Sequence, residues 1–298
     1  MCEPFKMIQH LTRNQLDEEK YNNCISKAVN MRIYAYSWYL DIVCDNWDAI
    51  ILDDYQAVMP LPKRKKYGIH YIYQAPWTQQ LGVFSDVVVE SSLVDQFIKS
   101  IPRKFKLIDV FLNSENTIDS SQIQLRDNYI LSLNRPYETI RKQFSKGRKS
   151  SVKQAEKFDL TIVDNYDHDV IIELFKKNKG LELHKKGLEY DILSKLIKYS
   201  LAFNFAKSYA VINDRNELIG GAFFLIDANR ITYLFSSIND KGRAKHAMSF
   251  LINHIIQTHA KSNYIFDFEG SVVKELASFF KSFGAEKETY FHFKKYII

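Results

Sequence analysis

The stretch from Arg230 to Gly284 constrains the fold most, because its pattern of polarity changes several times within a short span. Residues 231–237 (ITYLFSS) are rich in β-branched and aromatic side chains and predict a buried strand. A basic, glycine-containing loop at 239–246 follows. Apolar residues then recur at the spacing of one helix face, at Met248, Leu251, Ile252, Ile255 and Ile256. Residues 264–268 predict a second strand and 273–283 a second helix, with Gly284 placed for a left-handed C-cap.

A strand, a basic loop and a helix in this order can direct backbone N–H groups at an anion. A helix N-terminus carries unpaired donors and a partial positive charge. Lys241, Arg243 and Lys245 add full positive charges beside it. The pattern therefore predicts an anion site, and an ordinary turn with a solvated charge cluster is the alternative interpretation.

Two motifs in this region resemble known acyltransferases. Asn239-x-x-Gly242-x-Ala244 resembles the pyrophosphate loop of GNAT acyltransferases, Gln/Arg-x-x-Gly-x-Gly/Ala, with Asn in the first place. The segments 266–271 (FDFEGS) and 279–285 (FFKSFGA) resemble the end of the GNAT-like domain in Fem-type peptidoglycan aminoacyltransferases. This resemblance implies that the chain binds an acetyl- or other acyl-coenzyme A donor. The residues implied to hold that donor are Phe235, Ser236, Lys241, Gly242, Arg243, Ala244, Lys245, His246, Ala247 and Met248.

The order of predicted elements suggests two like domains. The first half predicts helices at 17–29 and 33–44, a hairpin at 49–52 and 56–59, a strand at 69–73, a helix at 93–101, a strand at 107–112 and a closing hairpin at 123–125 and 129–133. The second half predicts a strand at 160–163, helices at 169–178 and 189–199, a meander at 209–212, 218–226 and 231–237, and a last strand at 289–294. We predict a mixed α+β protein of two tandem GNAT-like domains, 1–134 and 135–298, each a mostly antiparallel sheet flanked by helices. Fem-type transferases are built in this way.

Composition sets wide limits. A chain of 298 residues with 46% hydrophobic and 26% charged residues is long enough for one large domain or two ordinary ones. The net charge of +6 permits an anionic partner without requiring one. The cysteines, Cys2, Cys24 and Cys44, are odd in number and lack metal-site spacing, as expected of a reducing cytoplasm. No apolar run approaches about 18 residues, so we expect no membrane span, and the histidine spacing predicts no metal site.

The segment that follows the predicted boundary is the most basic. Residues 141–156 (RKQFSKGRKSSVKQAE) resemble the Arg-x-x-Ile-Arg-Lys-Ala stretch that opens the second domain of Fem-type enzymes. An exposed amphipathic helix is one interpretation. The other is a phosphate or tRNA contact through Arg141 and Arg148, because clustered cations bind phosphate regardless of sequence. The long coiled-coil arm that some Fem enzymes carry is absent, which weakens the case for tRNA.

The resemblance implies direct attack of an amine on an activated acyl carbonyl. Backbone N–H groups near Phe235 and Ser236 would stabilise the oxyanion. Glu269 is the first candidate for general base and Asp267 the second, although Glu269 is alternatively a cap for a helix that starts at Ser271. GNAT enzymes often place a proton-donating Tyr where this chain has Phe280, so Tyr233 and Tyr290 are candidate substitutes.

By resemblance, the acceptor lies between the two domains. Its first-domain wall would comprise Trp38, Asp41, Lys63, Tyr73, Gln74, Gln79 and Gln80. The glutamine-rich segment is polar where a buried strand would be apolar, so its amides need partners, which either a ligand or a satisfied turn provides. The sequence thus predicts an acyltransferase that acts on a small or peptidoglycan-precursor-like amine. Aminoacyl-tRNA as donor and a non-catalytic scaffold for an anionic partner are the alternatives.

Overall fold

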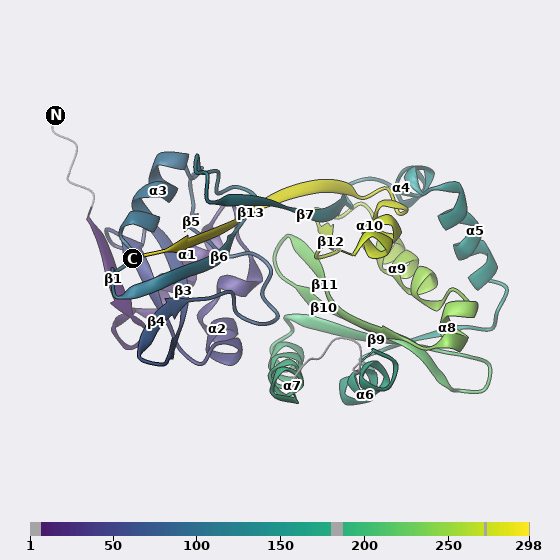
Figure 1. Cartoon of the computed structure of the whole chain (residues 1–298). Helices are drawn as coiled ribbons and strands as arrows, with labels where there is room; N and C mark the ends of the chain where they lie inside the picture. The colour runs from purple at the N-terminus through teal and green to yellow at the C-terminus, as the bar shows by residue number, and fades with distance from the viewer. Residues whose placement is uncertain (1–6, 180–186, 271–272, 298) are drawn as a thin grey trace. The chain divides into compact units, whose positions relative to one another are not determined.

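The computed structural model describes residues 7–179, 187–270 and 273–297 (Figure 1). The chain forms two compact units. Unit 1 comprises Met1–Arg126 and Thr289–Ile298, and unit 2 comprises Asp127–Glu288. Each unit is a mixed sheet flanked by helices, so the predicted α+β class is confirmed. No helix within the described ranges is both long and apolar enough to cross a membrane.

Unit 1 is built on a mostly antiparallel sheet. Its strands follow the order β1-β2-β3-β4-β6-β13, with β5 paired to β3, and only β4 and β6 run parallel among these pairs. The elements are β1 (Ile8–Thr12), α1 (Glu18–Lys27), α2 (Ser37–Val43), β2 (Trp47–Leu52), β3 (Ala57–Lys66), β4 (Ile69–Ile72), β5 (Phe84–Ser85), α3 (Ser91–Lys99), β6 (Phe105–Leu112) and the later part of β13 (Glu286–Tyr296).

Both faces of this sheet are covered because successive side chains of a strand point to opposite sides. Every residue of β2 is buried. Ile50 belongs to the core that contains Val94 and Phe97 of α3. Trp47 points the other way and packs against Tyr21 of α1, with ring centroids 5.3 Å apart. Burial on both faces explains the apolar run from Ala49 to Leu52, and Asp48 is the one charged residue in the strand.

Unit 2 has the strand order β7-β12-β11-β10-β9-β8, with β11 and β12 parallel and the other pairs antiparallel. Helices α6 and α7 lie on one face of the sheet, and α9 and α10 lie on the other (Figure 1). The elements are β7 (Ile123–Ser132), α4 (Tyr137–Gln143), α5 (Lys146–Ala155), β8 (Thr161–Asp164), α6 (His168–Lys179), α7 (Gly187–Ala202), β9 (Ala206–Ile212), β10 (Leu218–Ile226), β11 (Arg230–Ile238), α8 (Asp240–Ala244), α9 (Ala247–Thr258), β12 (Ile265–Asp267) and α10 (Lys274–Lys281).

The second core forms largely as its apolar spacing predicts. The α9 residues that the sequence places on one face are all buried, namely Met248, Leu251, Ile252, Ile255 and Ile256. The predicted meander corresponds to β9, β10 and β11. Gly284 has φ +79°, which confirms its predicted left-handed conformation. The helical spacing of the apolar residues and the position of Gly284 therefore predicted α9 and the end of the last helix correctly.

Some predicted elements were wrong. The expected closing hairpin at 123–125 and 129–133 is one continuous strand, β7. The expected helix at 33–44 is a short 3-10 turn (Ile33–Ala35) followed by α2. The last strand was expected to complete the second half, but residues 291–296 pair with β6 of unit 1. The unit to which this last strand belongs is decided by pairing between segments that are distant in the sequence, which local sequence patterns do not predict.

Candidate functional site

Strands β11 and β12 of unit 2 diverge, which opens an edge in the middle of the sheet. They pair in parallel only from Arg230 with Ile265 to Thr232 with Asp267. Beyond that point β11 continues to Ile238, and no strand among the described residues pairs with it on that side. Alternate backbone N–H groups of a strand point to the same side. The stretch from Tyr233 to Ile238 therefore directs donors toward the open edge.

A β-bulge lies at the start of this open edge. Phe223 of β10 pairs with Phe235, and Phe224 pairs with Tyr233, so Leu234 lies opposite no residue. A bulge bends a strand and increases its twist, and bulges are enriched near active sites. Phe235 and Ser236, predicted to surround the oxyanion, both lie in the bulged and diverging part of β11.

Aromatic side chains line the region beside the divergence. Phe280 of α10 is buried, with its ring centroid 5.0 Å from that of Phe268 and 6.3 Å from that of Tyr233. Burial raises the pKa of the Tyr233 phenol well above its usual value, and a hydrogen bond with Ser236 only partly opposes this shift. Tyr233 is therefore neutral near pH 7 and retains a proton that it can donate. Tyr290, the other candidate, belongs to unit 1 and packs against Phe111 there.

The predicted pyrophosphate loop forms a short helix instead of an open loop. The Asn239 side chain caps α8 by accepting a hydrogen bond from the Gly242 N–H at 2.9 Å. Gly242 is buried against β10, where an added Cβ would lie 2.1 Å from the Ile219 carbonyl oxygen. Close packing therefore explains this glycine, and the asparagine is explained as a helix cap.

Each cation predicted to hold donor phosphates has a carboxylate partner. Lys241 pairs with Glu217 at 2.7 Å, Arg243 with Asp240 at 2.8 Å, and Lys245 with Asp214 at 3.2 Å. Pairs at the surface contribute little to stability and exchange readily with other partners. The geometry nevertheless favours a solvated charge cluster, the alternative interpretation of this loop. Ala244 is exposed in the same short helix.

The start of α9 is a different candidate for an anion site. His246 precedes the helix in a left-handed conformation, and the first helical residues, Ala247 and Met248, are buried. Arg148 of α5 donates a hydrogen bond to Ser249 in the first turn of α9 and another, of 2.9 Å, to Ser282. The sequence predicted Arg148 and the α9 start separately, and the structure brings them together.

Arg148 is a desolvated cation whose charge is not balanced by a carboxylate in the described part of the chain. Its guanidinium carbon lies 4.2 Å from the ring centroid of Phe279 and 4.6 Å from that of Phe283. Burial alone lowers the pKa of Arg148 to about 10. An anion beside the guanidinium would restore the missing countercharge and would also meet the positive end of α9. Arg141 lies half-buried on α4.

Asp267 is held in a buried ion network, which argues against its role as a general base. Its carboxylate binds the Arg230 guanidinium at 2.5 Å, and it accepts hydrogen bonds from Asn128 at 3.0 Å and from the Glu269 N–H at 2.8 Å. Burial would lower the pKa of Arg230, but Asp267 and Glu288 beside it raise that pKa above its usual value. Both oxygens of Asp267 thus already accept from fixed donors.

Glu269 has the geometry of a strained, half-exposed residue at the end of β12. Its φ is +57°, a left-handed conformation that glutamate rarely adopts. Such outliers cluster at functional sites. The described part of α10 begins at Lys274 with Val273 as N-cap, and Ser271, where a capped helix was expected to start, lies outside the described residues.

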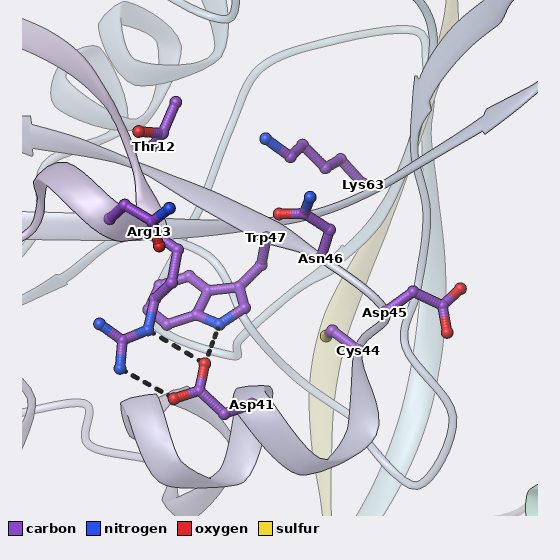
Figure 2. A pocket seen from close by; sticks show the side chains of 9 residues that line it. Thr12, Arg13, Asp41, Cys44, Asp45, Asn46, Trp47 and Lys63 are labelled. Atoms are coloured by element: carbon purple, nitrogen blue, oxygen red, sulfur yellow. Dashed lines mark hydrogen bonds and ion pairs between the residues drawn. The ribbon is translucent and has the colours of Figure 1, made fainter.

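Unit 1 contains a polar pocket of about 490 Å³ at the ends of β1 and β2 (Figure 2). Asp41 is one of its lining residues and accepts two hydrogen bonds from Arg13, at 3.0 and 2.8 Å, and one from Trp47 Nε1 at 2.7 Å. The hydrogen bond with Asp41 is the main cause that raises the pKa of Arg13 above its usual value. The lining residues are Thr12, Arg13, Asn14, Asp41, Cys44, Asp45, Asn46, Trp47 and Lys63.

Two predicted acceptor residues, Asp41 and Lys63, line this pocket. Lys63 is held by the buried carboxylate of Asp48 at 2.5 Å, and Asp48 also contacts His10 at 3.0 Å. Burial and the neighbouring Asp45 raise the pKa of the Cys44 thiol to about 12, so this thiol stays protonated. Sequence reasoning missed Arg13 and Trp47, since no motif links them to Asp41.

The other predicted acceptor residues mainly support the local structure. Gln74 donates to the Thr78 carbonyl at 2.6 Å and accepts from the Phe111 N–H at 3.0 Å. Gln80 donates to Gln79 at 2.8 Å and accepts from the Ser114 N–H at 3.2 Å. These contacts match the satisfied turn, one of the two interpretations of the segment. Trp38 packs edge-on against Tyr39, and Tyr73 stacks under the Arg64 guanidinium.

Comparison with solved structures identifies the fold. FemX superposes with a TM-score of 0.69 over 97% of this chain and 97% of its own, at 11% identity. The chain has the fold of FemX. The C-terminal domain of a putative lysylphosphatidylglycerol synthetase from Agrobacterium fabrum matches with a TM-score of 0.57 at 10% identity, over 93% of this chain and 91% of that one. L-PGS from Bacillus licheniformis matches with a TM-score of 0.54 at 13% identity, with the same coverage.

The Fem-type resemblance noted in the sequence is thus confirmed at the level of the fold. The relationship is remote in sequence. No protein-family model matches the chain, and no curated protein matches it. With identities of 10–13%, the structural likeness establishes the GNAT-like architecture and leaves the chemistry to be argued from this chain's own residues.

Proposed function

We propose that the protein is an N-acyltransferase that moves an acyl or aminoacyl group onto an amine. The observation that carries this proposal is the open, bulged edge of β11, together with the half-buried cation Arg148 at the start of α9. A site for acyl transfer needs donors preorganised toward a developing oxyanion and a means of holding an anionic donor. The edge from Tyr233 to Ile238 supplies the first, and Arg148 with the α9 start supplies the second.

The residues of unit 2 suggest how the reaction proceeds. The acceptor amine attacks the acyl carbonyl, and the resulting oxyanion accepts hydrogen bonds from backbone N–H groups near Phe235 and Ser236. The tetrahedral intermediate then collapses, which restores the carbonyl and breaks its bond to the leaving group. Glu269 takes the proton that the amine loses. Tyr233, kept neutral by burial, donates a proton to the leaving group, because Phe280 has no proton to give. In this assignment Asp267 holds Arg230 and the start of the turn, and it transfers no proton.

For the donor, we favour an acyl-coenzyme A whose phosphates bind Arg148 and the α9 start. A half-buried guanidinium that has no carboxylate partner among the described residues suits a phosphate, which forms strong charge-assisted hydrogen bonds. Aminoacyl-tRNA is the second candidate. It is favoured by the shared fold with FemX and with a protein named for making lysylphosphatidylglycerol, a lipid that carries an aminoacyl group.

For the acceptor, we propose the polar pocket of unit 1. Asp41 and Asp45 can attract an ammonium group, and Lys63 and Arg13 a carboxylate or phosphate, although a ligand has to compete with the ion pairs that these four residues already make. An amine that also carries an anionic group, such as a peptidoglycan-precursor-like peptide, matches this mixture of charges. No cluster of His, Cys, Asp and Glu side chains within the described ranges could hold a metal ion.

Calorimetry with acetyl-coenzyme A tests the donor site. Arg148→Gln removes the charge and should weaken binding by at least about tenfold, since a hydrogen bond to a charged group contributes roughly 1.5–3 kcal/mol. Lys241→Gln is the matched control, and it should leave affinity within about twofold because Lys241 already pairs with Glu217. If Lys241→Gln weakens binding more than Arg148→Gln does, the donor binds at the α8 loop instead. Gly242→Asp is unsuitable as a probe because the packing against Ile219 has no room for a side chain.

Turnover distinguishes an enzyme from a scaffold. Acetyl-coenzyme A and charged tRNA are each supplied with a panel of amines, and the acylated product is detected by mass spectrometry. Product that disappears in Glu269→Gln supports catalysis. If both donors bind but no amine is acylated, the non-catalytic scaffold is the better description.

A further inference from the structure

One end of the unit 1 sheet gathers strand ends from three parts of the sequence. The β3–β4 hairpin turns at Tyr67 and Gly68, and β6 begins beside it because His70 pairs with Phe105. β13 runs antiparallel to β6 and ends at the same place, where Tyr296 pairs with Leu107. These pairings place the hairpin tip, residues 103–106 and the end of β13 at one end of the sheet (Figure 1).

This end of the sheet is strongly basic. Its exposed cations, which we call the sheet-end cations, are Lys65, Lys66, Arg103, Lys104 and Lys106. None of them has a carboxylate partner among the described residues, although Lys66 lies 5.3 Å from the ring centroid of Tyr67 and Lys104 lies 5.2 Å from that of Phe105. Unpaired like charges repel one another, so their convergence favours an anionic partner.

Exposed apolar side chains interleave with these cations. Tyr67 is 92% exposed at the hairpin tip, Ile69 is 53% exposed at the start of β4, and Tyr296 is 66% exposed near the end of β13. Tyr71, Leu107 and Tyr296 pair in register across β4, β6 and β13, so they form one row on one face of the sheet. Tyr71 and Leu107 in this row are only half-buried.

We propose that this end of unit 1 binds the surface of an anionic lipid bilayer. Lysines near an anionic bilayer gain electrostatic attraction, and tyrosine is favoured at the level of the headgroups. Ile69 and the row that ends at Tyr296 provide apolar contact that a purely electrostatic partner would not use. Nucleic acid fits less well, because four of the five sheet-end cations are lysines, which bind phosphate as point charges, and because an isoleucine offers no stacking surface for bases.

Sedimentation with large vesicles tests the proposal. The full-length protein should co-sediment with vesicles that contain phosphatidylglycerol and remain in solution with phosphatidylcholine alone. Raising salt from about 0.1 M to about 1 M shortens the Debye length from about 10 Å to about 3 Å and should release most of the protein. Lys65→Glu with Lys66→Glu should lower the partition coefficient at least about 25-fold, at roughly fivefold for each lost cation.

Two further variants separate charge from insertion. Tyr67→Asn with Ile69→Thr leaves the charge unchanged. Both replacements suit the local backbone, because Tyr67 has a left-handed φ of +50°, which asparagine tolerates, and Ile69 lies in a strand, where threonine is favoured. This pair should reduce binding severalfold and make the remainder more sensitive to salt. Tyr67→Trp should shift its fluorescence emission to the blue when anionic vesicles are added. The charge-matched control, Lys27→Glu with Lys195→Glu, alters exposed lysines on α1 and α7 and should bind like the parent protein.

Several results would overturn the proposal. They are equal binding to both kinds of vesicle, an equal loss in the control variant, and an unshifted Tyr67→Trp emission at saturating lipid. If the protein does not bind vesicles but binds tRNA, and tRNA binding falls in Lys65→Glu with Lys66→Glu, the surface is assigned to RNA. The acyltransferase proposal is tested separately with soluble acceptors, so either idea can fail while the other survives.

Discussion

Replacing Asp267 with alanine should destabilise unit 2 strongly, because Asp267 supplies most of the charge that balances a buried arginine. Arg230 and Asp267 are 5% and 1% exposed. Their ion pair is 2.5 Å long, whereas the contacts between Arg230 and Glu288 are 3.2 and 3.4 Å. Asp267→Ala would leave the guanidinium with the weaker of its two carboxylates. It would also remove the acceptor of the Glu269 N–H.

The magnitude follows from these contacts. Removing one partner of a buried ion pair costs about 3–5 kcal/mol, and each buried donor left without an acceptor adds roughly 1 kcal/mol or more. Glu288 still balances part of the Arg230 charge in the variant, so we expect a loss of about 3–4 kcal/mol in the free energy of unfolding. That is a large share of the roughly 5–15 kcal/mol that stabilises a domain.

Urea denaturation followed by circular dichroism measures the effect in a double-mutant cycle. Arg230→Met removes the charge but keeps an apolar stem of similar length, so Asp267→Ala combined with Arg230→Met should cost less than the sum of the two single changes. The matched control is Glu269→Gln, which should change stability by less than about 1 kcal/mol while abolishing turnover. An Asp267→Ala protein that is as stable as its parent, or a cycle without coupling, would refute the reasoning.

Three further predictions follow from local geometry. Gly242→Ala should lower the free energy of unfolding by about 2–4 kcal/mol, because its Cβ would lie 2.1 Å from the Ile219 carbonyl oxygen. Gly147→Ala, which has open space around it in α5, should raise the free energy of unfolding by up to about 1 kcal/mol. The urea midpoints of the two variants, each compared with the parent protein, measure both effects. Tyr233→Phe should reduce turnover at least about tenfold and leave donor affinity, measured by calorimetry, unchanged. Burial lowers the pKa of His254 and His259 below the ordinary 6.5, so the unfolded chain binds protons first as the pH falls. The free energy of unfolding should therefore be fully retained above about pH 6.5 and should decline below it, less steeply in His254→Gln with His259→Gln.

Local pattern was sufficient for most elements of the fold. The α9 face, the β9–β11 meander and Gly284 follow from helical spacing, alternation and a left-handed glycine, all of which are properties of neighbouring residues. The failures concern pairing over long distances. Residues 123–133 contain polar residues in the middle that look like a turn, yet they form one strand. Residues 291–296 lie at the far end of the sequence from β6, with which they pair.

The loop that was predicted to bind the donor, residues 239–246, shows why a short motif does not decide between two structures. An asparagine followed three residues later by a glycine suits a phosphate loop, where backbone must approach an anion. It equally suits a capped helix packed tightly on a strand, and the structure has the second arrangement. The two cases share residue types because both need a short polar acceptor and an absent side chain. The contact between Gly242 and Ile219 distinguishes the capped helix from the phosphate loop. This contact depends on the tertiary structure, so the motif alone does not predict it.

Arg148 shows the converse, since its importance depends on neighbours that sequence order does not reveal. In the sequence it is one cation among many, and an exposed helix was a reasonable interpretation. In the structure Arg148 is half-buried, stacks on two phenylalanine rings and donates a hydrogen bond to Ser249 at the start of α9, while neighbouring Lys149 donates to the Lys142 carbonyl. A protein gains no stability from burying an unbalanced charge. An anion bound there would balance the charge, which supports the proposal that Arg148, more than the paired cations of the α8 loop, holds the donor.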